Sequence, residues 1–103
     1  MPITLTLTKT PPKSEKRYRA IFRIHKGGDI IKITDFGVKN FKIGTYIDHG
    51  DKISRRNYRV RHKGDLDTKD FKRAGYLSYF LLWGEHSDLN KNIKDYKKKY
   101  NLD

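Results

Sequence analysis

The residues best suited to chemistry form a basic run between Lys52 and Lys63. The run holds six Lys or Arg residues in twelve positions, together with one Tyr and one His. Four of the six cations are Arg, whose planar guanidinium can pair with phosphate oxygens through two hydrogen bonds at once. A helix stabilised by its own ion pairs would interleave Glu, which is absent from the run. The pattern favours contact with a polyanion, and a solvated helix face is the alternative.

A second basic cluster lies near the C-terminus, where Lys97, Lys98 and Lys99 follow Lys94. Lysines near a helix C-terminus are also favoured by the helix dipole, so capping and phosphate contact explain this cluster equally well. Backbone binding is favoured over base reading because the chain has no helix-turn-helix, zinc-finger or RNA-recognition motif. The candidate nucleic-acid-binding residues are Lys52, Arg55, Arg56, Arg59, Arg61, Lys63, Lys94, Lys97 and Lys98.

The positive charge belongs to the whole chain. In 103 residues, 24 Lys and Arg stand against 12 Asp and Glu, which gives a net charge of +12. Such a charge destabilises a compact protein through self-repulsion, and a bound polyanion would relieve it. The length suits one domain, and an aromatic content of 13% argues against disorder. We therefore expect one basic domain spanning residues 1–103 that binds nucleic acid, with DNA favoured over RNA.

Catalytic motifs have little support in this chain. Residues 35–37 read Asp-Phe-Gly, the magnesium motif of kinases, but the other kinase motifs are missing. His49 with Asp48 and Asp51 is the best candidate for a metal or nuclease site, yet no zinc-type histidine spacing occurs. There is no Cys, which excludes thiol nucleophiles and disulfides. We expect no enzymatic activity, no catalytic or metal-binding residue and no cofactor, and a metal-dependent nuclease is the least favoured alternative.

Alternation of apolar and polar residues predicts strands in the N-terminal part. Residues 3–8 alternate Leu or Ile with Thr, which is typical of a half-buried strand. Residues 17–24 alternate again, and residues 30–36 supply a return strand ended by Gly37. The intervening Gly-Gly pair provides the positive φ that a hairpin turn needs. Residues 38–50 are expected to be a loop with room for a short strand.

The next segment predicts a helix over residues 51–62. Asp51 is expected to cap it by accepting the free N–H groups of its first turn. Ile53 and Val60 are seven residues apart and are expected to anchor one face, while the cations project into solvent.

Two further helices are predicted downstream. Asp67 or Thr68 is expected to cap the first, which runs to about Trp83 and stops at Gly84. Ser87 is expected to cap the last, whose apolar stripe consists of Leu89, Ile93, Tyr96 and Tyr100. The predicted fold class is α+β, with a small antiparallel sheet packed against about three C-terminal helices.

Several landmarks follow one another in a fixed order from Tyr18 onward. They are residues 18–22 (Tyr-Arg-Ala-Ile-Phe), 35–39 (Asp-Phe-Gly-Val-Lys), 49–52 (His-Gly-Asp-Lys), 58–62 (Tyr-Arg-Val-Arg-His), 73–79 (Arg-Ala-Gly-Tyr-Leu-Ser-Tyr), 82–84 (Leu-Trp-Gly) and 93–100 (Ile-Lys-Asp-Tyr-Lys-Lys-Lys-Tyr). In order and spacing the chain resembles a family of small basic proteins of unknown function encoded by nucleocytoplasmic large DNA viruses, the giant viruses.

The resemblance implies a viral setting. It suits a protein of the virion or of the virus factory, in the host cytoplasm or nucleus, where a genome must be neutralised and packed. The alternative is a structural protein that binds acidic surfaces of other virion proteins, for which the strand at residues 3–8 offers a sheet edge. The N-terminus lacks a secretory signal, and no apolar run is long enough to cross a membrane. We expect neither secretion nor membrane binding.

Overall fold

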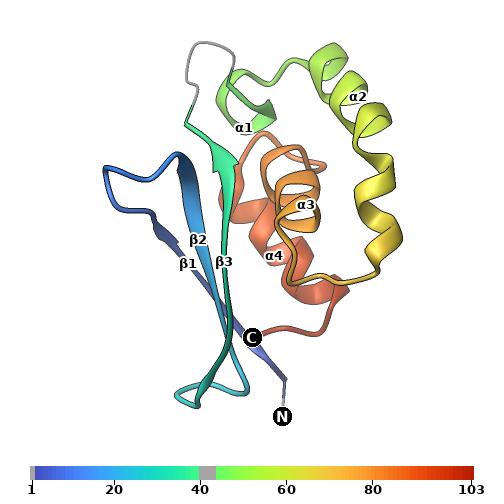
Figure 1. Cartoon of the computed structure of the whole chain (residues 1–103). Helices are drawn as coiled ribbons and strands as arrows, with labels where there is room; N and C mark the ends of the chain where they lie inside the picture. Colours follow the sequence, from blue (N-terminus) through green and yellow to red (C-terminus); the bar gives the residue numbers. More distant parts are fainter. Residues whose placement is uncertain (1, 40–43) are drawn as a thin grey trace.

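The N-terminal part of the chain forms a three-stranded antiparallel sheet. The computed structural model describes residues 2–39 and 44–103. The strands β1 (Thr4–Lys9), β2 (Lys16–Arg23) and β3 (Ile30–Val38) lie side by side in the order β1-β2-β3. Figure 1 shows the helices gathered on one face of this sheet, so the predicted α+β class is confirmed.

The alternation within each strand decides which side chains enter the core. Leu5 pairs with Phe22, and Ala20 pairs with Thr34, so these residues share the face toward the helices, where all four are buried. The neighbouring row of Thr6, Ile21 and Ile33 points to the other face. That second face is not covered by any helix in the described part of the chain (Figure 1).

The predicted hairpin between β2 and β3 is confirmed. The Ile24 N–H donates to the Asp29 carbonyl at 2.9 Å, and Gly27 has φ of +75° in the turn. The strand does not end at Gly37 as predicted but continues to Val38. Gly37 has φ of +78°, and a Cβ there would lie 2.9 Å from Cδ1 of Leu82. Glycine thus keeps the strand going while a helix side chain packs closely against it.

The helical part is more broken than the sequence predicts. Its elements are α1 (Tyr46–His49), α2 (Lys52–Arg61), the 3₁₀ segment η1 (Lys63–Thr68), α3 (Ala74–Leu77), its π-helical continuation η2 (Ser78–Leu82) and α4 (Leu89–Lys99). The short α1 lies where a loop with room for a short strand was expected, and residues 40–43 of that stretch lie outside the described residues.

The start of α2 agrees with its sequence signal. The Asp51 carboxylate accepts the N–H groups of Ile53 at 2.9 Å and Ser54 at 3.3 Å, as predicted for a helix cap.

The predicted caps of the other two helices are wrong. Lys69 takes a left-handed conformation (φ 52°), and the Asp70 carboxylate accepts the Lys72 N–H at 3.0 Å. These local turns hold the chain outside a helix until Arg73, so neither Asp67 nor Thr68 begins one. Asp88 rather than Ser87 caps α4 and accepts the Asn90 N–H at 2.9 Å. A carboxylate next to the first helical residue is the stronger acceptor for the free N–H groups there.

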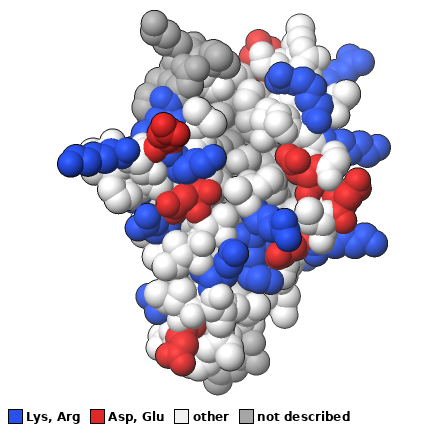
Figure 2. Space-filling model, viewed as in Figure 1, with Lys and Arg blue, Asp and Glu red and all other residues white. Residues whose placement is uncertain are grey.

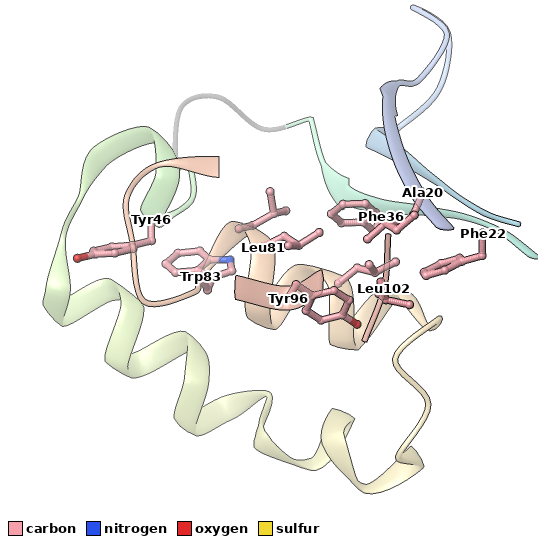
Figure 3. Packing of buried hydrophobic residues seen from close by; sticks show 11 residues of the cluster. Ala20, Phe22, Phe36, Tyr46, Leu81, Trp83, Tyr96 and Leu102 are labelled. Carbon is pink, nitrogen blue, oxygen red and sulfur yellow. The ribbon is translucent and has the colours of Figure 1, made fainter. Parts of the chain in front are cut away.

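The core lies between the sheet and the helices. Figure 3 shows Ala20, Phe22 and Phe36 of the sheet facing Leu81 and Tyr96 of the helical layer. The predicted apolar stripe of α4 is confirmed. Tyr96 is buried, and the other residues of the stripe, Leu89, Ile93 and Tyr100, pack against the core. Most of the aromatic residues are buried or pack against this core.

The C-terminus lies beside the first strand. The Leu5 N–H donates to the Asp103 carbonyl, and the Asp103 N–H donates to the Ile3 carbonyl, both at 2.9 Å. Asp103 therefore occupies the beginning of the free edge of β1, the edge that was considered as a binding site for a partner.

Candidate nucleic-acid interface

Helix α2 has an inner and an outer face, and its apolar residues lie on the outer one. Ile53 is 73% exposed and Val60 is 70% exposed, so the prediction that they anchor the helix is wrong. Tyr58 provides the anchor, because its ring stacks on Trp83 with centroids 4.4 Å apart and planes 7° apart. An aromatic ring buries more apolar area than an aliphatic side chain, which favours this orientation of the helix.

Arg55 lies on the inner face of α2 and contacts the loop after η2. Its Nε donates to the Gly84 carbonyl at 2.6 Å, and its Nη2 lies 3.1 Å from Oε1 of Glu85. The guanidinium also lies 5.6 Å from the centroid of the Tyr46 ring. Arg55 therefore joins α1, α2 and the 84–85 loop.

Arg59 follows Arg55 by one turn of α2 and contacts the C-terminal end of η2. Its Nη1 donates to the Trp83 carbonyl at 2.9 Å, and its guanidinium lies 4.2 Å from the centroid of the Tyr79 ring. Carbonyl groups at a helix C-terminus lack partners within the helix and attract cations. Arg55 and Arg59 satisfy these carbonyls, so these two predicted binding residues hold the fold together.

The remaining cations of the basic run face solvent. Lys52, Arg56, Arg61 and Lys63 are exposed, and none of them forms an ion pair within residues 2–39 and 44–103. Arg61 makes only a long contact of 3.4 Å from its Nε to the Asn57 carbonyl. Figure 2 shows Lys and Arg side chains projecting along the edge formed by α2 and η1. We call these four residues the α2 cations.

Helix α4 presents a second set of cations. Lys94 and Lys98 are exposed, whereas Lys97 is partly buried. Lys91 was not among the predicted residues, although it is exposed and precedes Lys94 by three positions. The i, i+3, i+7 spacing places Lys91, Lys94 and Lys98 on one stripe, and helical periodicity could have identified it. This exposed stripe shares Lys98 with the consecutive lysine run, in which Lys99 is also exposed.

Many of the acidic residues already have partners within the fold. Asp35 pairs with Arg19 at 2.8 Å, and Asp51 and Asp88 cap helices. His86 Nε2 lies 3.0 Å from Oδ2 of Asp95. Because these carboxylates already have partners, the excess cations on α2 and α4 remain available to an external anion.

Asp48 of α1 forms an ion pair with Arg17 of β2 that joins the helical part to the sheet. Its two carboxylate oxygens accept hydrogen bonds from Nη1 and Nη2 of Arg17 at 2.7 and 2.6 Å. It also accepts the N–H of Thr45 at 2.7 Å. The hydrogen bonds from Arg17 are the main reason that the pKa of Asp48 falls to about 2.

The best candidate metal site is taken up by structural contacts. Asp48 pairs with Arg17, Asp51 caps α2, and His49 Nδ1 accepts the Asp51 N–H at 2.9 Å. Within the part of the chain that the structure describes, no three His, Asp or Glu side chains are grouped so that they could hold a metal ion.

An aromatic column lies beside the α2 cations. The ring of Tyr58 stacks on His62 with centroids 4.2 Å apart, and on Trp83 as described above. Burial raises the pKa of Tyr58 to about 12, so its hydroxyl stays protonated at neutral pH. No local sequence signal predicts this column, because Trp83 lies 25 positions beyond Tyr58.

The fold and surface define a small basic α+β protein with two cationic helix faces. The chain belongs to a family of unknown function, DUF5754, whose model matches residues 6–62, more than half of its length. The match runs from β1 to the end of α2. Comparisons with curated proteins and with solved structures gave no match. Among the described residues, no helix has the length and apolar character needed to cross a membrane.

Proposed function

We propose that this protein is a non-catalytic, non-sequence-specific nucleic-acid-binding protein. The observation that carries the proposal is the set of exposed cations without ion-pair partners on α2 and α4, in a chain with a net charge of +12. Phosphate contacts position a protein on nucleic acid without reading its sequence. Lys52, Arg56 and Arg61 lie along the ten-residue helix α2, which is roughly 15 Å long, and Lys63 follows in η1, so the set can span several phosphates.

The viral setting forms part of this proposal. Resemblance to small basic proteins of giant DNA viruses supports a role in genome packaging or in the virion core. In that role the protein would meet DNA in the virion or in the virus factory, and binding without sequence preference would suit it. A backbone-binding protein gains affinity by releasing counterions from any stretch of the genome.

One observation favours a second candidate function. Ile53 and Val60 are exposed on the same face of α2 as Arg56. An apolar pair among cations suits an acidic, amphipathic protein surface better than a row of phosphates. The protein would then be a structural component of the virus particle that binds acidic neighbours.

The two candidates are separated by a salt titration. Binding to a fluorescein-labelled duplex is measured by anisotropy at several NaCl concentrations. Phosphate binding predicts micromolar or tighter affinity near physiological salt and a log–log slope of about −0.9 for each phosphate, with roughly four to eight phosphates neutralised. No detectable binding at physiological salt would contradict nucleic-acid binding and leave the acidic protein partner.

A further inference from the structure

A cleft of about 440 Å3 opens between α2 and the end of β3. The volume lies within the roughly 300–1,000 Å3 typical of small-molecule sites. Its floor is the α3 helix, seen between β3 and α2 in Figure 1, and Figure 2 shows the same face of the molecule. The cleft adjoins the α2 cations, because one of them, Arg61, belongs to its lining together with the neighbouring His62.

The walls of the cleft are apolar and aromatic. Tyr58, His62 and Trp83 line one wall, and their rings form the stacked column already described. Val38 lines the sheet side, and Ala74 lies on the floor. Tyr58 is stacked between the other two rings, so the column presents ring edges to the cleft, and a planar ring can meet such edges in an edge-to-face contact.

Polar groups are distributed around these walls. The lining includes Ser78, and Asp65, whose Oδ2 lies 3.1 Å from Nδ1 of His62. They offer a hydroxyl and a carboxylate to the polar edge of a ring. Lys16 from the sheet and Arg61 from α2 also line the cleft, and both are exposed. Neither forms an ion pair in the described part of the chain, so both can receive a phosphate.

A nucleotide has the features that these groups would bind, namely a planar ring with a polar edge and an attached phosphate. We propose that this cleft binds one unstacked nucleotide of a single strand, with its base against the aromatic wall and its phosphate between Lys16 and Arg61. This inference rests on the proposed function and deepens it by naming a single strand as the ligand. A base that is paired within a duplex cannot enter the cleft. The α2 cations would then hold the phosphates next to the bound nucleotide.

Trp83 provides a direct reporter of the cleft, because it is the only Trp in the chain and forms part of the lining. The full-length protein is titrated with dAMP, dGMP, dCMP and dTMP, and its emission is recorded. Ribose 5-phosphate serves as the control that carries a phosphate without a base. The proposal predicts a saturable emission change with at least one mononucleotide and none with ribose 5-phosphate.

Three variants locate the binding. Ala74→Leu narrows the cleft and Arg61→Gln removes a phosphate partner, and each is expected to weaken mononucleotide binding about ten-fold or more, as expected for loss of base or phosphate contacts. Arg56→Gln removes the same charge from α2 but lies outside the lining, so mononucleotide affinity should change less than about two-fold. If Ala74→Leu fails to fold, Lys16→Gln takes its place, since Lys16 is exposed.

The outcomes separate this inference from the proposed function. Equal emission changes with ribose 5-phosphate, or unchanged mononucleotide affinity in both Arg61→Gln and the cleft variant, would overturn the nucleotide site. Salt-dependent duplex binding could persist in that case, and the proposed function would stand. Loss of duplex binding together with specific mononucleotide binding would overturn backbone recognition and keep the cleft.

Discussion

The guanidinium of Arg59 lies over the ring of Tyr79, 4.2 Å from its centroid. The same group donates to the carbonyl of Trp83, at the end of the helix that carries Tyr79. A residue from the most basic segment is therefore a structural link between α2 and the centre of the helical layer. The orientation of α2 therefore divides the cations of that segment into those that contact the rest of the fold and those that face solvent.

Arg59 is expected to contribute to stability and Arg56 is not. Arg59→Ala removes a hydrogen bond to a helix-end carbonyl and a cation–π contact, so the free energy of unfolding should fall by about 1–3 kcal/mol. Arg56→Ala removes an exposed cation from the same helix and should stay within about 0.5 kcal/mol. Urea denaturation followed by circular dichroism measures both. Equal effects of the two substitutions would contradict the structural role of Arg59.

The exposed aliphatic residues of α2 should tolerate polar replacement. Ile53→Ser and Val60→Ser are expected to change the free energy of unfolding by less than about 1 kcal/mol, because neither side chain is buried. Leu81→Ser, which places a hydroxyl in the core, should cost several times more. Thermal unfolding midpoints of the three variants give the comparison. A large loss at Ile53 or Val60 would mean that α2 packs through its other face.

Stability should fall as the pH is lowered through the titration range of Asp48. The pKa of its carboxyl is lowered from 3.8 to about 2, so the folded state holds this proton less tightly than the unfolded chain. The stabilisation, roughly 1 kcal/mol once solvent screening of this partly exposed ion pair is allowed for, is complete above about pH 5 and is lost as the pH falls toward 2. Asp48→Asn should lower the free energy of unfolding by about this much at pH 7. It should also reduce the loss of stability between about pH 5 and pH 2, which we call the acid limb of the stability curve.

The control for this prediction is Asp67→Asn. Asp67 is exposed and forms no ion pair in the described chain. Its substitution should leave the acid limb unchanged, as measured by urea unfolding between pH 2 and 7. An acid limb in Asp48→Asn that matches the unmodified protein would show that the Arg17–Asp48 pair does not stabilise the fold.

Substitution of Gly84 by any residue with a side chain is expected to destabilise the fold. A Cβ at this position would lie 2.1 Å from the carbonyl oxygen of Phe80 and 2.8 Å from Oδ1 of Asn92. Asn92 is buried and accepts the His86 N–H at 3.0 Å, so it cannot withdraw without losing that bond. Gly84→Ala should therefore cost about 2–4 kcal/mol. Gly64→Ala, where no atom lies within 4 Å, should cost little, and a scan of melting temperatures distinguishes the two.

Much of the fold could be predicted from local chemistry. Alternation identified all three strands because side chains on a strand point to opposite faces by geometry alone. The cap at Asp51 was predictable because a carboxylate satisfies the first N–H groups of its own helix. The break at Lys69 was not, because it depends on backbone turns around Asp70 that have no distinct sequence pattern.

The candidate site was predicted in composition but not in orientation. The segment is rich in Arg, and Arg can pair with phosphate or with the carbonyls at the end of another helix. The contacts of Arg55 and Arg59 with Gly84 and Trp83 join segments 24 to 29 positions apart, which periodicity within one helix cannot reveal. For the same reason, the aliphatic pair on α2 was assigned to the wrong side of the helix.

The most direct test compares two triple variants of equal charge. One neutralises Lys52, Arg56 and Lys63 to Gln, and the other neutralises Lys9, Lys13 and Lys26, which are exposed and lie outside α2 and α4. The salt dependence of duplex binding is measured for each by anisotropy. Direct phosphate contact predicts that the α2 variant loses up to about 2.7 from the magnitude of the log–log slope while the control keeps most of it. Equal losses in the two variants would show that only net charge matters and would contradict a binding surface on α2.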